Sequence, residues 1–280
     1  GVTISDPDGI TIIGGCNAAG GLTLAFRLKR QGGTLRIEEL PPLPVALDDM
    51  AGARLGNRLY LVGGLTNGEP SAAMYAYDFN YGEWFACAPL PKARVQPVCA
   101  AQGGRLFVWG GYVQPIDSLG RVQGEACAVY TDGLQYDPQA DHWSPAPAPT
   151  DEAGHPLTLT GGAAIPWGDD EVLAVGGVNR NVFLGGIQGL FPMPDYLLHE
   201  PEWYRFNSRL LVYSVTTGQW RQLAQSELAA RAGASLVVLP TEDVVAMDDE
   251  TAETPRHAAL LLGGELKPGI RSGAVTLLTE

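Results

Sequence analysis

A carboxylate and a guanidinium stand six residues apart in the stretch Gly-Glu-Leu-Lys-Pro-Gly-Ile-Arg, which ends at Arg271. Glu265 can accept and return a proton, as a general acid/base does, and the planar fork of Arg271 can hold an anion. The Pro268-Gly269 turn between them is rigid and would keep the two side chains at a fixed separation. Structural ion pairs are common, so the spacing alone favours a Glu–Arg pair that staples a loop.

Other chemistry-bearing residue types show no pattern. The four histidines share no spacing, which argues against a metal site, and the four cysteines lack a C-x-x-C pair and are expected to be buried thiols. No Gly-x-Ser-x-Gly elbow and no phosphate-binding loop occurs. These residues therefore give no pattern for a metal site, a serine nucleophile or a phosphate-binding loop.

The charge balance restricts the partners. The formal net charge is -13, and the chain has three lysines and fifteen arginines. Nucleic acid and anionic membrane surfaces need a basic footprint, so neither is expected as a partner. The same field repels a small anionic ligand, so an anion site needs arginines placed locally. No run of about 18 apolar residues occurs, so no membrane insertion is expected.

An internal repeat must position these residues. Five short apolar runs end in a Gly-Gly doublet, at Gly14-Gly15, Gly63-Gly64, Gly110-Gly111, Gly176-Gly177 and Gly263-Gly264. Three units add a tyrosine seven residues before a tryptophan across a polar turn, at Tyr77 and Trp84, Tyr136 and Trp143, and Tyr213 and Trp220. Each unit predicts four antiparallel strands, with the tryptophan on the outer strand.

A sheet of this kind cannot bury both of its faces alone, whereas stacking radially against its copies does so. The sequence therefore predicts an all-β, kelch-type β-propeller in a single domain. The blades are expected at about residues 1–44, 45–90, 91–147, 157–225 and 228–280, with a flap over the channel mouth, or a packing insertion, at residues 181–207. Leu47, Arg94 and Arg231 open inner strands at similar phase, so Arg94, Arg231 and Arg271 are expected to converge near Glu265.

Four stretches go beyond a generic kelch pattern: "GGVNRNVF" from Gly176, "WYRFNSRLLVY" from Trp203, "RAGASLVV" from Arg231 and "GELKPGIR" from Gly264. Together they resemble the N-acetylneuraminate epimerase (sialic acid mutarotase) family, and the order of the units is similar to its cyclically permuted branch. The resemblance implies six blades, of which five are recognisable here. It also marks an acidic insertion at residues 241–257, and Asp49 where the family pattern has Asn.

The resemblance implies a bacterial mutarotase of carbohydrate metabolism, which interconverts the α and β anomers of N-acetylneuraminate or a related sugar by general acid/base ring opening. It implies Glu265 and Arg271 as the catalytic pair, and it reverses the preference for a mere loop staple. Such an enzyme needs no metal and no redox cofactor, and its partner is a small sugar acid. The resemblance implies a periplasmic location, although the given chain shows no charged-then-apolar signal pattern at its N-terminus and a cytoplasmic location stays open.

Five further residues are candidates for binding the sugar: Arg94, Gln96, Asn179, Asn207 and Arg231. The arginines would grip its carboxylate, and the amide side chains would either bond the sugar or simply cap turns. A non-catalytic kelch scaffold that binds a carbohydrate or a protein is the alternative function, because propellers host many functions. A copper oxidase of the propeller type lacks a plausible Tyr/His ligand set.

Overall fold

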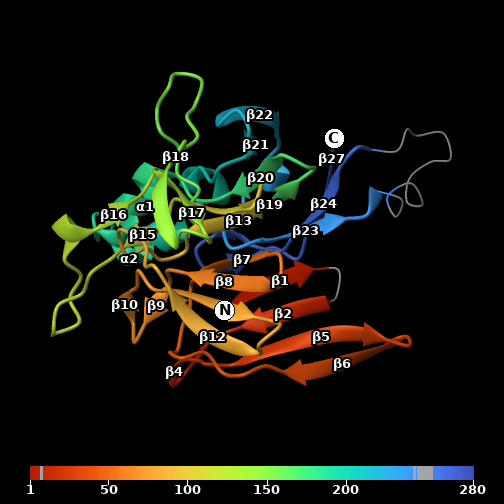
Figure 1. Ribbon diagram of the computed structural model, residues 1–280. Helices are drawn as coiled ribbons and strands as arrows, with labels where there is room; N and C mark the ends of the chain where they lie inside the picture. Colours follow the sequence, from red (N-terminus) through yellow and green to blue (C-terminus); the bar gives the residue numbers. More distant parts are fainter. Residues whose placement is uncertain (7–8, 242–243, 245–254) are drawn as a thin grey trace.

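The computed structural model describes residues 1–6, 9–241, 244 and 255–280. Five antiparallel sheets follow one another along the chain, and each is one blade of a β-propeller (Figure 1). Four sheets have four strands and the fifth has three. The predicted all-β propeller with five recognisable units is therefore confirmed. Most of the predicted acidic insertion at 241–257 lies outside the described residues.

The strands of each blade are ordered from the central channel outward. Blade 1 contains β1 (Val2–Asp6), β2 (Gly9–Ile13), β5 (Ala25–Gln31) and β6 (Thr34–Glu39). Blade 2 contains β7 (Ala51–Leu55), β8 (Arg58–Val62), β11 (Met74–Asp78) and β12 (Glu83–Cys87). Blade 3 contains β13 (Val98–Gln102), β14 (Arg105–Trp109), β17 (Gly133–Asp137) and β18 (His142–Ala146). Blade 4 contains β19 (Gly162–Trp167), β20 (Glu171–Gly176), β21 (Arg209–Ser214) and β22 (Gln219–Gln225). Blade 5 contains β23 (Ser235–Leu239), β24 (Ala258–Leu262) and β27 (Val275–Thr279).

Each Gly-Gly doublet ends the second strand of its blade, as predicted, because the next blade approaches too closely for a side chain. A Cβ on Gly63 would lie 2.5 Å from the Arg94 carbonyl oxygen of blade 3, and one on Gly176 would lie 2.3 Å from the Arg231 carbonyl oxygen of blade 5. In four blades a short hairpin follows the doublet: β3–β4 (Cys16–Asn17, Gly20–Gly21), β9–β10 (Leu65–Thr66, Glu69–Pro70), β15–β16 (Tyr112–Val113, Ala128–Val129) and β25–β26 (Glu265–Lys267, Ile270–Arg271).

The tyrosine–tryptophan spacing fixes the register of the two outer strands. Tyr136 and Trp143 are directly opposite each other on β17 and β18, with ring centroids 5.0 Å apart, and the pairs in blades 2 and 4 repeat this arrangement. Each tryptophan indole N–H also donates to a carbonyl at the end of the preceding blade: Trp84 to Pro41, Trp143 to Ala88 and Trp220 to Pro147. The repeat motif therefore joins strands within a blade and blades to one another.

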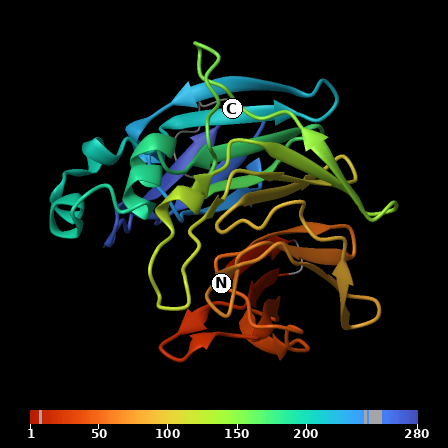
Figure 2. The same cartoon turned by 90° about the vertical axis from the view of Figure 1, so that its left-hand side faces the viewer.

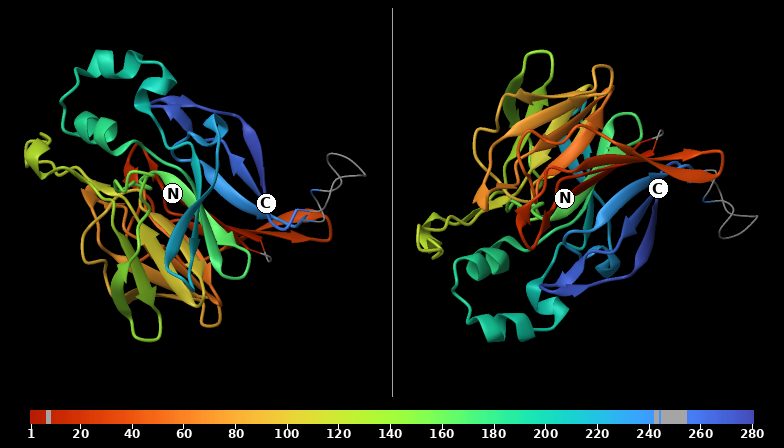
Figure 3. Two further views of the ribbon diagram at one scale, coloured as in Figure 1. Left: turned by 90° about the horizontal axis from the view of Figure 1, so that it is seen from above. Right: turned by 90° about the horizontal axis from the view of Figure 1, so that it is seen from below.

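The hydrophobic core is divided into clusters that lie between consecutive blades. Four such clusters join blade 1 to 2, 2 to 3, 3 to 4 and 4 to 5. Among the described residues no fifth cluster joins blade 5 to blade 1. Leu35 and Ile37 on β6 are 73% and 70% exposed, and Val275 on β27 is 62% exposed. The ring of blades is therefore open between its first and last members, whose strands are red and blue in Figure 3.

Blade 4 carries helices in place of the short hairpin. The helices α1 (Arg180–Ile187), α2 (Met193–Leu198) and α3 (Pro201–Tyr204) connect β20 to β21 and project beyond the sheets (Figure 2). Aromatic rings hold this segment together: Phe191 stacks on Tyr196, and His199 on Trp203. The described residues also form 3-10 turns at Gly124–Ala126 and Glu227–Ala229. Among the described helices, none has the length and apolarity to cross a lipid bilayer.

Candidate functional site

A ring of backbone surrounds one mouth of the central channel. Just before the inner strands of blades 2 to 5, one residue in each blade has a positive φ: 49° at Asp49, 48° at Gln96, 70° at Gly161 and 64° at Gly233. These four residues, which we call the mouth ring, are joined in sequence by backbone hydrogen bonds. Gln96 N–H donates to the Asp49 carbonyl (2.8 Å), Gly161 N–H to Gln96 (3.1 Å) and Gly233 N–H to Gly161 (2.7 Å).

The mouth ring combines two kinds of residue for a physical reason. Glycine adopts the left-handed region without cost, whereas a residue with a side chain pays about 1 kcal/mol there. Asp49 and Gln96 nevertheless occupy it and bring polar side chains to the mouth. A Cβ added at Gly233 would meet no atom within 4 Å, so this side of the mouth stays open.

The channel behind the mouth ring is a cavity of about 490 Å³. Its walls are the inner strands of the blades, and its lining includes all four members of the mouth ring together with Glu265 and Arg271. The structure therefore brings Glu265, Arg271 and Gln96 to one cavity.

Glu265 and Arg271 are directly opposite each other on β25 and β26. One guanidinium nitrogen of Arg271 lies 3.5 Å from a carboxylate oxygen of Glu265, and the two side chains are 79% and 32% exposed. The backbone of Glu265 is fixed to the mouth ring's neighbour Ala232 by two hydrogen bonds, of 2.7 and 3.0 Å. The turn at Pro268-Gly269 closes the hairpin, with Gly269 at φ 78°. The pair is thus held on a defined backbone and stays accessible from the channel.

The Arg94 side chain is buried in blade 3 and binds groups of the protein itself. Its side chain has no exposed surface, and it donates to the Gly110 carbonyl (2.8 Å) and to both carboxylate oxygens of Asp132 (3.0 and 3.1 Å). The guanidinium also lies over the ring of Tyr130, at 4.8 Å from its centroid. A group without exposed surface cannot meet a ligand in the channel in this conformation, so the expected contact with a substrate is replaced by a contact within blade 3.

Arg231 is buried in the same way in blade 5, with 2% of the residue exposed. Its guanidinium donates to the carbonyls of Gly263 and Ala274, both at 3.1 Å, and to the hydroxyl of Thr276 at 2.7 Å. The expected convergence of Arg94 and Arg231 at the mouth is therefore not what the structure shows, because both guanidinium groups bind the chain itself.

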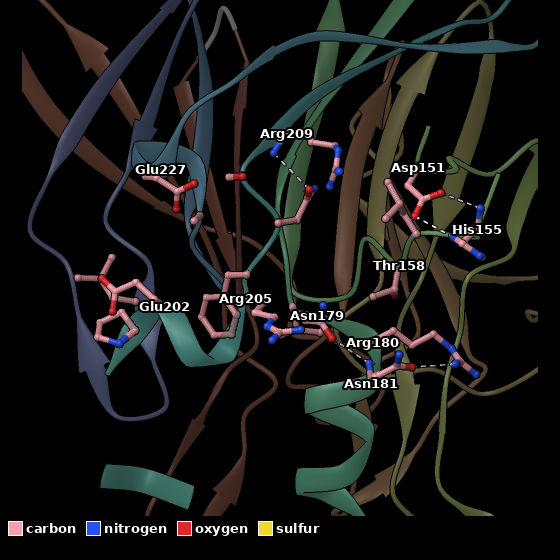
Figure 4. Close-up of a pocket in the computed structure, with 18 of the residues that line it drawn as sticks. Asp151, His155, Thr158, Asn179, Arg180, Asn181, Glu202, Arg205, Arg209 and Glu227 are labelled. Atoms are coloured by element: carbon pink, nitrogen blue, oxygen red, sulfur yellow. Dashed lines mark hydrogen bonds and ion pairs between the residues drawn. The ribbon is translucent and has the colours of Figure 1, made fainter. Parts of the chain in front are cut away.

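Asn179 and Asn207 lie in a second, larger cavity of about 1120 Å³ between the helices of blade 4 and the neighbouring loops (Figure 4). The Asn179 side chain caps α1 by accepting from the N–H groups of residues 181 and 182. The Asn207 amide donates to the Gly176 carbonyl (3.1 Å) and accepts from the Arg209 N–H (3.2 Å). Both therefore serve the local backbone, and Leu266, the neighbour of Glu265, is the point where the β25–β26 hairpin reaches this cavity.

Sequence reasoning missed three arginines in this second cavity, Arg180, Arg205 and Arg209. In the described part of the chain none of them has a carboxylate within ion-pair distance. Arg205 has a left-handed backbone (φ 52°, ψ 45°) as the C-cap of α3. In Figure 4 the Arg180 side chain runs towards Asn181 and away from Arg205, so the guanidinium groups do not converge. The clustering of arginines around Asn207 in the sequence could have pointed to them, but only the fold shows that these arginines face a cavity.

Acidic groups near the mouth shape its electrostatics. Burial, together with the charges of Asp49 and Asp48, raises the pKa of the Tyr112 hydroxyl to about 12. Burial also raises the pKa of Asp48, whose Oδ1 has no hydrogen-bond partner in the described structure. The blade 2 side of the mouth is therefore acidic, and among the described residues that line the channel Arg271 is the cationic side chain.

The fold and the site define an open, kelch-type β-propeller with a carboxylate–guanidinium pair at the mouth of its channel. The family model for N-acetylneuraminate epimerase matches residues 40–279, and the chain belongs to this family. The resemblance seen in the sequence is thereby confirmed.

Individual relatives agree with this assignment. The chain is 28% identical over 246 residues to the N-acetylneuraminate epimerase of Haemophilus influenzae (strain PittEE), covering 83% of this chain and 57% of that protein. It is 26% identical over 263 residues to that of Brucella melitensis, covering 88% and 60%. The solved structure of YjhT superposes with a TM-score of 0.65 at 26% identity, over 86% of this chain and 65% of that one. The chain thus spans between 57% and 60% of these two curated relatives.

Proposed function

We propose that the protein is a sugar-acid mutarotase, which interconverts the α and β anomers of N-acetylneuraminate or a close relative, and that Glu265 and Arg271 carry the reaction. The observation that supports this proposal is the pair itself: a carboxylate and an accessible guanidinium 3.5 Å apart, both lining the channel. The names of the relatives supply the sugar, and the pair supplies the two groups that its chemistry requires.

Arg271 is suited to bind the carboxylate of the sugar. Its side chain is 79% exposed, and its contact with Glu265 is too long for a hydrogen bond, so its donors are free for a two-pronged contact. The carboxylate of a sialic acid is attached to the anomeric carbon. A sugar held by Arg271 therefore has its anomeric hydroxyl beside Glu265.

Glu265 is suited to move the proton. Its carboxylate accepts the proton of the anomeric hydroxyl, the bond between the anomeric carbon and the ring oxygen breaks, and a ketone forms. The ring oxygen gains one proton in this step, and the protonated Glu265 can supply it. After rotation about the bond that joins the ketone carbon to the chain, the steps run in reverse and close the ring on the other face. No net proton or electron is gained or lost.

The mouth ring provides the remaining contacts in this proposal. Gln96 lines the same cavity as Glu265 and can bond hydroxyl groups of the sugar. Asn179 and Asn207 lie in the second cavity and are occupied with backbone groups, so we assign them the support of α1 and of the turn before β21.

The test is anomer exchange followed by NMR after α-N-acetylneuraminate is dissolved, with buffer alone as the reference because the uncatalysed reaction is measurable. Glu265→Gln keeps the shape and removes the proton acceptor. We expect it to lower the catalysed rate by about 10²-fold or more, the scale of a lost acid/base group. Exchange at the wild-type rate would show that Glu265 only staples the loop, and would favour a non-catalytic, carbohydrate- or protein-binding propeller.

A further inference from the structure

Arg231 contacts both ends of the hairpin that carries the candidate catalytic pair. The chain leaves β24 at Gly263, turns through Glu265 and Arg271, and enters β27 after Ala274. The Arg231 guanidinium donates to the carbonyl oxygens of Gly263 and Ala274, and it also donates to the Thr276 hydroxyl on β27. One side chain thus joins the two points between which the hairpin projects into the channel mouth.

Blade 3 contains the same device in a different form. Arg94 donates to the carbonyl of Gly110, which has the position of Gly263, and binds the carboxylate of Asp132, which has the position of Ala274. The backbone pattern is the same, since Gly110 N–H donates to Asp132 and Gly263 N–H donates to Ala274. In blade 3 a carboxylate neutralises the arginine. In blade 5 alanine replaces it, and among the described residues no carboxylate lies within ion-pair distance of Arg231.

Burial of a cation without a counter-ion costs free energy, so the hydrogen bonds that Arg231 makes must offset that cost. Burial lowers the pKa of Arg231, yet an arginine keeps its charge because its ordinary pKa lies far above neutrality. The charge therefore strengthens the hydrogen bonds to both carbonyls. Blade 5 needs this support because β27 is its outermost strand and no fourth strand covers it in the described structure.

We infer that Arg231 is a positioning residue for the reaction: it clamps the base of the β25–β26 hairpin and so fixes the separation of Glu265 and Arg271. This inference rests on the proposed function. Arg231 does not line the channel cavity, whereas its neighbours Ala232 and Gly233 do. It acts on the reaction through the backbone, without touching the sugar.

The kinetic test uses Arg231→Met, which removes the donors and keeps a long side chain, and Arg231→Lys, which keeps the charge and loses the fork. A displacement of about 1 Å at reacting groups can cost 10²-fold in rate. We expect Arg231→Met to lower kcat at least tenfold with KM changed less than threefold, and Arg231→Lys to retain more of kcat than Arg231→Met. A rise in KM at unchanged kcat would overturn the inference, because it would make Arg231 a ligand of the sugar.

Loss of stability needs its own control. Trp143→Phe removes the indole bond to the Ala88 carbonyl on the outer strand of blade 3, far along the sheet from the channel. We expect it to lower the unfolding midpoint and leave kcat within twofold of wild type. If Trp143→Phe lowers kcat as much as Arg231→Met does, the effect of Arg231 is general destabilisation and the inference fails.

Hydrogen exchange separates this inference from the proposed function, because it needs no activity. The amides of Glu265 and Ser272 donate to Ala232 and Gly264. In Arg231→Met and in the milder Arg231→Lys we expect both to exchange at least tenfold faster, and in Arg94→Met to exchange as in wild type. If the wild type does not exchange anomers faster than buffer, the proposed function fails while this result still shows the clamp. Unchanged protection in both Arg231 variants would refute the clamp itself.

Discussion

Replacement of Arg271 separates binding from proton transfer at the proposed site. The side chain is 79% exposed and approaches Glu265 at 3.5 Å, so the ion pair contributes at most a few tenths of a kcal/mol to folding. Changes at Arg271 should therefore leave the unfolding free energy unaltered. Any loss of activity then reports on the reaction.

The magnitude follows from the number of hydrogen bonds lost. A guanidinium that holds a carboxylate in two-pronged fashion makes two charge-assisted bonds, each worth about 1.5 kcal/mol at an accessible position. Arg271→Lys keeps the charge and one bond, so about 1.5 kcal/mol is lost and KM should rise about tenfold. Arg271→Ala loses both bonds, so KM should rise about a hundredfold.

The assay is NMR anomer exchange over a range of sugar concentrations, corrected for exchange in buffer, so that KM and kcat are obtained separately. Arg36→Ala is the matched control, because Arg36 is an exposed arginine on β6 and its removal changes the net charge equally. It should leave KM unchanged. If Arg271→Lys and Arg271→Ala leave KM at the wild-type value, Arg271 does not hold the sugar carboxylate and the proposed orientation of the sugar is wrong.

Two further predictions concern stability and association. The Asp141 carboxylate accepts from the Ala88 N–H (2.8 Å) and from the Tyr136 hydroxyl (2.5 Å), and these bonds, the backbone one most, lower its pKa. A lowered carboxyl pKa stabilises the fold above the ordinary value of about 4, and this contribution is lost as the pH falls through the folded-state pKa. Wild type should therefore lose more unfolding free energy than Asp141→Asn between pH 5 and 3 in urea titrations, and parallel losses would contradict the assignment. Leu35 and Ile37 are 73% and 70% exposed on the uncovered face of blade 1. Changing both to Lys should reduce self-association in sedimentation experiments and alter unfolding free energy by less than about 0.5 kcal/mol; association at the wild-type level would show that this face is not adhesive.

The sequence by itself determined the repeating unit of this protein. The apolar runs that end in Gly-Gly, and the tyrosine–tryptophan spacing, depend on contacts between neighbouring strands, whose period is visible in one dimension. Trp143 is on an outer strand opposite Tyr136, as its spacing predicted. The Glu265–Arg271 pairing was also readable, since a tight Pro-Gly turn brings residues on either side of it together.

Only the tertiary structure decided what the other arginines do and how the site is built. Arg94 and Arg231 have the repeat phase expected for a ring of residues around the channel. Whether a long side chain points into the channel or back into its own blade depends on the hydrogen-bond acceptors that each position offers. Asp132 and the carbonyl oxygens of Gly110, Gly263 and Ala274 draw both guanidinium groups inward. The hydrogen bonds of the mouth ring likewise join residues from successive blades, and such contacts leave no period in the sequence.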